Sequence, residues 1–297
     1  MEIGRVGVFS VPLEVMGRAR GVEFVQQLEE LGYAAVWTGE GLGTREIFTN
    51  ASVLLAGTRR IVFCAGIANV WTRDAVTMVT AARTLMESYP ERFLLGLGIS
   101  HREQVDPRGH TYSKPVSTMR AYLDEMDSAP FVSPLPQETA ATEPVMRVLA
   151  ALRPPMLHLA AERADGAHPY MTTPDATAAA REILGADRIL APEQAFLLET
   201  DRSLARRIGR AYLAWYLGVE NFRKSLLWQG FHETDLDGGG SDRLVDAIVA
   251  WGDEEAVRDR VEEHLEAGAS HVCVQAIAED PLELGIESYR RLAQAVL

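Results

Sequence analysis

Cysteine is scarce in this chain of 297 residues: only Cys64 and Cys273 occur, each inside an apolar run (IVFCAGIA and HVCVQAIA). Two isolated cysteines exclude a disulfide framework, and neither has the spacing to other cysteines or histidines that binds zinc. A cysteine inside such a run behaves as a small hydrophobic residue. We therefore expect two buried thiols and no metal site.

Long apolar runs and an excess of basic residues are also missing. No run reaches the roughly 18 apolar residues that a membrane span needs. The 42 acidic side chains outnumber the 29 Lys and Arg, and a formal net charge of -13 repels a phosphate backbone. We expect neither a membrane nor a nucleic-acid partner. The first predicted strand begins at residue 3 and leaves no room for a signal peptide, so we expect a cytoplasmic protein.

The usual nucleotide-binding signatures are absent as well: no GxGxxG opens a helix, and there is no Walker sequence. What the chain does contain is an alternation of strand and helix patterns. Strands are predicted at residues 3–10, 33–38, 61–68, 93–99, 145–151, 166–171, 188–198 and 271–276. Helices are predicted at residues 21–31, 47–57, 74–88, 115–126, 155–164, 174–184, 254–267 and 286–296.

Apolar strands that alternate with amphipathic helices indicate a parallel sheet covered by helices. Eight strand–helix pairs fit a single (β/α)₈ TIM barrel over residues 1–297, although periodicity alone leaves an open, doubly wound sheet as the alternative. Two segments exceed the repeat and are predicted as insertions after strands 4 and 7. They are residues 100–144, which end in the loop-like SAPFVSPLPQETAATEP, and residues 200–253, which are rich in aromatic residues.

Polar side chains follow several of the predicted strands. Glu40 follows the second strand, Asn69 the third, Ser100 and His101 the fourth, and His168 the sixth. In a barrel the carboxyl ends of all strands meet at one mouth, where active sites are built. A single histidine in such a place is usually structural, and it is the shared location that suggests a site.

Five segments, which occur in this order along the chain, carry a resemblance. They are LEELGYAAVWTGE, RRIVFCAGIANVWTRDAVTMVTAARTLMESYPERFLLGLGISH, ALRPPMLHLAAERADGAHPYMTTP, LAPEQAFLLET and GSDRLVDAIVAWGDEEAVRDRVEEHLEAGASHVCVQ. They resemble luciferase-like monooxygenases, and within that class the actinobacterial branch that uses the deazaflavin coenzyme F420. The resemblance implies a TIM barrel, a homodimer, and an enzyme that acts on a small organic substrate with F420 or, alternatively, FMN. A non-catalytic cofactor carrier on the same scaffold is the lesser alternative.

The resemblance also implies a cofactor site. It places a non-proline cis peptide at Gly66–Ile67, behind the central ring of the cofactor, and matches a set of further residues to cofactor-contacting positions. These are Glu40, Asn69, Ile99, Ser100, Gln104, Leu152, Arg153, Pro155 and Met156. Arg153 stands where relatives have glycine or small residues that seat the cofactor phosphate at a helix N-terminus, which suits an anion. Arg153 could reach over that phosphate, or it could crowd the approach of the phosphate to the backbone and weaken binding; we expect contact.

The resemblance makes His101 the expected catalytic residue. It occupies the position at which related deazaflavin dehydrogenases carry a carboxylate, and an imidazole can exchange a proton near neutral pH. His168 and Tyr170 are expected on the substrate side. Gly41 replaces the catalytic histidine of sugar-phosphate-oxidising relatives, and Tyr170 and Thr173 replace their phosphate anchors, so that activity does not transfer to this chain.

Overall fold

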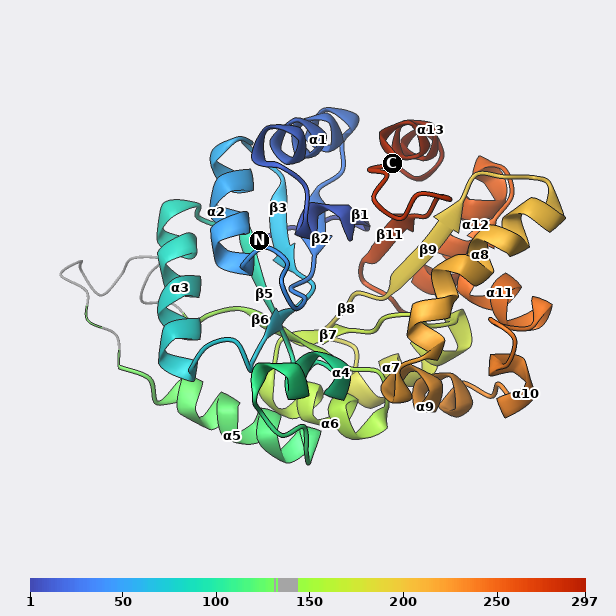
Figure 1. The fold of residues 1–297 in the computed structure, drawn as a ribbon. Helices are drawn as coiled ribbons and strands as arrows, with labels where there is room; N and C mark the ends of the chain where they lie inside the picture. The colour runs from blue at the N-terminus through green and yellow to red at the C-terminus, as the bar shows by residue number, and fades with distance from the viewer. Residues whose placement is uncertain (131, 133–143) are drawn as a thin grey trace.

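In a computed structural model, which describes residues 1–130, 132 and 144–297, parallel strands form one curled sheet surrounded by helices (Figure 1). Its strand order is β10-β9-β11-β1-β2-β3-β5-β6-β7-β8, and β4 pairs with β5. The strands are β1 Val6–Phe9, β2 Ala35–Thr38, β3 Val62–Ala65, β4 Ala68–Asn69, β5 Phe93–Gly98, β6 Arg147–Ala150, β7 Gly166–His168, β8 Ile189–Leu190, β9 Glu193–Leu197, β10 Val249–Trp251 and β11 Val272–Ala276.

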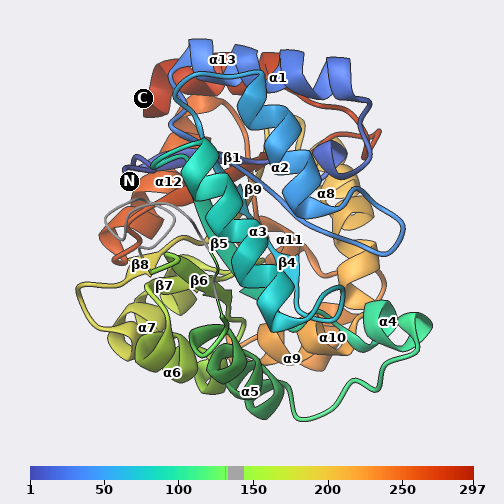
Figure 2. The ribbon, with the colours of Figure 1, turned by 90° about the vertical axis from the view of Figure 1, so that its left-hand side faces the viewer.

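The eight predicted helices are all present, with bounds shifted by three residues at most. They are α1 Arg18–Leu31, α2 Ile47–Ala56, α3 Ala75–Ser88, α5 Pro115–Asp127, α6 Pro154–Arg163, α7 Pro174–Leu184, α12 Glu254–Glu266 and α13 Ile286–Val296. Helices α1 and α13, from opposite ends of the chain, lie side by side (Figure 2). None of the helices described is both long and apolar enough to cross a membrane.

Local sequence explains where these helices start. The side chains of Asp74, Thr173 and Asp253 each accept a hydrogen bond from a backbone N–H in the first turn of α3, α7 and α12. Such N-caps satisfy donors that the helix itself leaves unpaired. At the other end of α1, Gly32 adopts a left-handed conformation with a φ of 98°, which only glycine adopts without strain.

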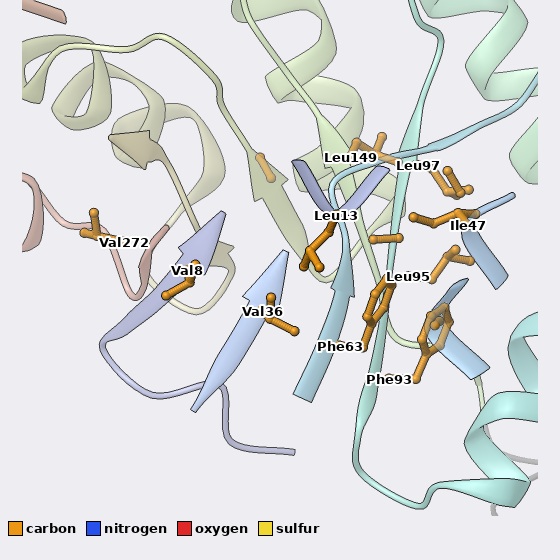
Figure 3. Close-up of a cluster of buried hydrophobic side chains, with 14 of the residues drawn as sticks. Val8, Leu13, Val36, Ile47, Phe63, Phe93, Leu95, Leu97, Leu149 and Val272 are labelled. Atoms are coloured by element: carbon orange, nitrogen blue, oxygen red, sulfur yellow. The ribbon is translucent and has the colours of Figure 1, made fainter. Parts of the chain in front are cut away.

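The hydrophobic core lies between the sheet and its helices. Residues of successive strands such as Val8, Val36, Phe63 and Leu95 are buried in it (Figure 3). Both faces of the strands are buried, as expected for parallel strands covered by helices. Cys64 and Cys273 are free, buried thiols in a second cluster within the sheet, which confirms the prediction for both cysteines.

The sequence did not predict every strand correctly. The predicted strand at 188–198 is split into β8, which pairs with β7, and β9, which pairs with β11 and β10. Pro192 lies between the two pieces, and proline has no N–H to donate to a ladder. Strand β10 was missed, because its three residues are too few to show a pattern.

Two further predictions concern the third and fourth strands. The predicted strand at 61–68 ends at Ala65, and the Gly66–Ile67 peptide that follows is cis, as predicted. Of the loop predicted at 128–144, residues 131 and 133–143 lie outside the part of the chain that the structure describes.

The two segments predicted as insertions contain further helices. Residues 100–144 contain α4 Arg102–Val105 and α5. Residues 200–253 contain α8 Arg202–Leu217, α9 Glu220–Trp228, α10 Glu233–Leu236, α11 Asp242–Ile248 and β10. Short 3₁₀ helices occur at η1 Pro12–Glu14 and η2 Asp106–Arg108.

Candidate active site

A cavity of about 820 Å³ opens at the carboxyl ends of the strands. Of the residues that the sequence assigned to a site, all but Asn69 line it: Glu40, Gly66, Ile67, Ile99, Ser100, His101, Gln104, Leu152, Arg153, Pro155, Met156, His168 and Tyr170. Residues more than 100 positions apart in the chain therefore meet in one place, as the strand-end rule predicts.

The bend between β3 and β4 forms one wall of the cavity and depends on glycine. A Cβ on Gly66 would lie 2.8 Å from Cε2 of Phe9, and a Cβ on Gly98 would lie 2.3 Å from Cδ1 of Ile67. Both distances are shorter than van der Waals contact allows. Gly66 and Gly98 thus let Ile67 pack tightly against the end of β5, and leave a smooth apolar surface facing the cavity.

Glu40 lines the cavity, but its carboxylate is already bonded within the protein. Both of its oxygens accept hydrogen bonds from the Arg73 guanidinium, and Oε2 also accepts from the backbone N–H of Asn69 at 3.0 Å. The side chains of Glu40 and Arg73 are only 4% and 7% exposed. Asn69 lies off the cavity, with its amide Nδ2 buried and unpaired among the described residues. This buried ion pair ties β2 to the loop after β4.

His101 belongs to a chain of side chains that starts at Arg153. The Arg153 guanidinium donates to Oδ1 of Asn221 at 3.3 Å, and Nδ2 of Asn221 lies 3.3 Å from Nδ1 of His101 and 2.7 Å from the Tyr112 hydroxyl. The His101 ring packs against Phe222, with 4.8 Å between ring centroids. Burial lowers the pKa of His101 to about 4, and the negative charge of Glu103 opposes the shift only in part. The imidazole is therefore neutral at pH 7.

The start of helix α6 differs from what the sequence suggested. Pro154 and Pro155 occupy its first two positions and have no N–H, and the N–H of Met156 donates to the carbonyl of Arg153 at 3.1 Å. The first turn therefore offers an anion no free N–H from these three residues. Only the guanidinium of Arg153 remains as a strong partner, and it is the one Lys or Arg side chain among the described residues that line the cavity.

His168 lies deeper in the cavity, stacked on Trp37 at 4.6 Å between ring centroids. Its Nδ1 lies 2.7 Å from the carbonyl oxygen of Ala191, so Nδ1 carries the proton, and Nε2 is a buried acceptor without a protein partner in the described part of the chain. Burial lowers the pKa of His168 to about 4, against the opposing effect of the Ala191 carbonyl. A ligand with an N–H or O–H group would satisfy this acceptor.

Three tyrosines that line the cavity form a hydrogen-bonded group. The Tyr170 hydroxyl lies 2.8 Å from that of Tyr216 and donates to Oε1 of Gln275 at 2.8 Å, and the Tyr212 hydroxyl donates to Tyr170 at 3.3 Å. Behind them lies Glu193, whose pKa burial raises to about 8 despite hydrogen bonds from Met171 and Tyr212. Trp215 and Phe222 extend this group into an aromatic wall (Tyr170, Tyr212, Trp215, Tyr216 and Phe222).

Glu14, on the 3₁₀ turn after β1, is a cavity residue that the sequence reasoning missed. Burial raises the pKa of its carboxyl to about 7; the backbone N–H of Gly39 opposes the rise, and Glu40 adds to it. Glu14 is thus a carboxyl group that can hold or release a proton near neutral pH. Its position after a strand was the available signal, the same one that identified Glu40.

Comparisons with known proteins show the family and the fold of the chain. The family model described as luciferase-like monooxygenase matches residues 7–271. A 5,10-methylenetetrahydromethanopterin reductase of Methanolobus tindarius is 22% identical, over 84% of this chain and 87% of the relative. An F420-dependent secondary alcohol dehydrogenase in complex with an F420–acetone adduct shares the fold with a TM-score of 0.77 at 16% identity, covering 100% of both chains. The oxygenating constituent of 3,6-diketocamphane monooxygenase from Pseudomonas putida, in complex with FMN, has a TM-score of 0.71 at 14% identity, covering 98% of this chain and 97% of that one.

Proposed function

The chain belongs to the luciferase-like monooxygenase family, and from this premise we propose that it is an F420-dependent oxidoreductase acting on a small organic substrate. The observation that carries the proposal is the cavity itself. An apolar surface formed by Gly66, Ile67 and Ile99 lies in the same cavity as the guanidinium of Arg153. A flat ring attached to a phosphate has these two parts, and two solved structures with the same fold are named as F420-dependent enzymes.

When bound, a deazaflavin supplies or accepts a hydride at its C5. The protein's own residues would then bind the cofactor, orient it toward the substrate and keep water away from both. Arg153 would hold the phosphate, since a guanidinium forms strong charge-assisted bonds to phosphate oxygens. The acceptor Nε2 of His168 would receive a hydrogen bond from an N–H or O–H of the bound molecules. The aromatic wall would exclude water from the reacting atoms.

Two residues would act on the substrate, one by hydrogen bonding and the other by proton transfer. His101, which is neutral at pH 7, would act on a substrate oxygen by hydrogen bonding and not as a proton source. Glu14, with a pKa of about 7, is the group that would hold or release the proton. Apart from Arg153, the charged side chains among the described residues that line the cavity are acidic (Glu14, Glu40, Glu279, Asp280 and Glu283), so the substrate we propose carries no phosphate or carboxylate.

The alternative within the same family is an FMN-dependent monooxygenase. It is favoured by the family's description and by the FMN-bound monooxygenase that shares this fold. Both cofactors have a tricyclic ring and a phosphate, so the same cavity would receive either one.

Fluorescence titration of the purified protein with F420 and with FMN tests the proposal. Saturable quenching by F420 at micromolar concentrations, with at least about tenfold weaker binding of FMN, is the expected result. Tighter binding of FMN would replace the proposal with the monooxygenase alternative. Binding of neither cofactor would exclude both enzymes. We further propose a homodimer, which light scattering of the same preparation would test.

Replacing Arg153 with alanine should weaken F420 binding by about 1.5–3 kcal/mol, or roughly 10- to 150-fold, because the prolines of α6 leave the phosphate few other strong partners. The same titration measures the effect. Arg223→Ala is the matched control: it removes a guanidinium from α9 that pairs with Glu233 outside the cavity, and should leave affinity unchanged. Equal affinities of the two variants would show that the phosphate does not contact Arg153.

A further inference from the structure

We propose that Asn221 is a positioning residue that fixes the tautomer of His101, so that His101 presents an N–H rather than a lone pair to whatever occupies the cavity. The role of that N–H in turnover rests on the proposed function. The tautomer itself does not, because it follows from contacts within the protein. Asn221 lies in the first turn of α9, some 120 residues from His101, and was not singled out by the sequence.

The first step concerns the orientation of the Asn221 amide. A guanidinium can only donate hydrogen bonds, so the amide atom 3.3 Å from Arg153 must be the oxygen. The opposite orientation would place an NH₂ group against a guanidinium, with two donors facing each other. Arg153 therefore determines which end of the amide faces His101, even though side-chain oxygen and nitrogen are similar in shape.

The second step concerns the imidazole. With its oxygen toward Arg153, Asn221 directs its NH₂ group at Nδ1 of His101, at 3.3 Å, and at the Tyr112 hydroxyl, at 2.7 Å. Nδ1 must accept, so the single proton of the neutral ring resides on Nε2. No acceptor within the described part of the chain bonds to Nε2, and His101 lines the cavity. The N–H is thus left for a ligand oxygen.

The surroundings keep the ring in this neutral form. The ring contacts Phe222 and Asn221, both from α9, and the charge that acts on it is that of Glu103. The Tyr112 hydroxyl and the Arg153 guanidinium contact Asn221. Only Glu103 favours protonation, and burial outweighs it, which leaves the pKa of His101 at about 4. His168 shows the opposite arrangement, because its Nδ1 donates to a carbonyl and its Nε2 is the acceptor. The cavity therefore has one imidazole of each tautomer.

The test uses Asn221→Asp, which reverses the hydrogen bond with little change of shape. A carboxylate accepts only, so it requires a proton on Nδ1, and its charge should raise the pKa of His101 by about 1–3 units. An acidic residue in the first turn of a helix is favourable, so the variant should fold. Tyr112→Phe is the control, since it removes a neighbour of Asn221 but leaves the contact with Nδ1.

The measurement is nitrogen NMR of ¹⁵N-histidine-labelled protein without cofactor, titrated between pH 4 and 8. The spectrum of His101→Gln identifies the His101 signals among the seven histidines. We expect protonated Nε2 and unprotonated Nδ1 in the wild type and in Tyr112→Phe, and protonated Nδ1 with a raised pKa in Asn221→Asp.

Protonated Nδ1 in the wild type, or an unchanged tautomer and pKa in Asn221→Asp, would overturn the proposal. Should Asn221→Asp fail to fold, Asn221→Ala takes its place, and loss of a single dominant tautomer is then the expected result. A cofactor titration that fails while these spectra behave as expected would reject the proposed function and leave the assignment of Asn221 standing.

Discussion

Arg73→Met should lower the free energy of unfolding by about 3–5 kcal/mol, because it removes one partner of a buried ion pair and leaves the other charged. The side chains of Arg73 and Glu40 are 7% and 4% exposed. Without the guanidinium, the Glu40 carboxylate would keep, within the described residues, only the hydrogen bonds from the Asn69 backbone and the Thr72 hydroxyl. Methionine fills much of the space of the aliphatic part of arginine. Most of the loss in the free energy of unfolding would therefore come from the unpaired Glu40 carboxylate.

Urea denaturation of the wild type and the variant measures this difference. Arg120→Met is the matched control: Arg120 forms a bidentate pair with Glu162, but the two side chains are 42% and 54% exposed. An exposed pair contributes about 1 kcal/mol or less. The double variant Arg73→Met/Glu40→Gln should recover part of the stability, because no buried charge remains. A loss in Arg73→Met no larger than in Arg120→Met would show that the pair is solvated in solution.

The order of strands and helices could be predicted from the sequence, because burial on both faces gives a parallel strand a continuous apolar run. Val6–Phe9 and Val62–Ala65 are examples. The split between β8 and β9 was foreseeable in principle, since Pro192 lies within the predicted strand and proline is excluded from the middle of a ladder. By contrast, β10 is set by its pairing with β9 and has no signal in its own three residues.

The site was predictable to the extent that it is built from strand ends. That rule brings His101, His168 and Arg153 to one cavity although they come from different elements. It cannot find Asn221, which comes from α9 and reaches His101 only through the folding of a helical segment. Nor does the sequence reveal that Glu40 is bonded to Arg73, or how far burial shifts the pKa of His101, because both depend on neighbours distant in the chain.

His101→Ala should lower turnover about 10²- to 10³-fold on a substrate identified for this enzyme, the usual effect of removing one donor aimed at a developing negative charge on oxygen. The expectation follows from the neutral ring and from the Nε2–H that Asn221 imposes on it. Affinity for F420 should change little, because Arg153 and the Gly66–Ile67 surface remain. Stopped-flow measurement of hydride transfer, combined with the cofactor titration, separates the two effects.

His101→Gln distinguishes a hydrogen-bond donor from a proton carrier. Glutamine keeps an N–H but does not titrate, so turnover within about tenfold of the wild type is expected if His101 only donates a hydrogen bond. The pH profile should then show no inflection from His101 above pH 5, and an inflection near pH 7 should persist in His101→Gln and disappear in Glu14→Gln. A glutamine variant as slow as the alanine variant, together with loss of the inflection near pH 7, would instead make His101 the residue that carries the proton. In that case the donor role assigned to its Nε2–H would be wrong, and Glu14 would take no part in proton transfer.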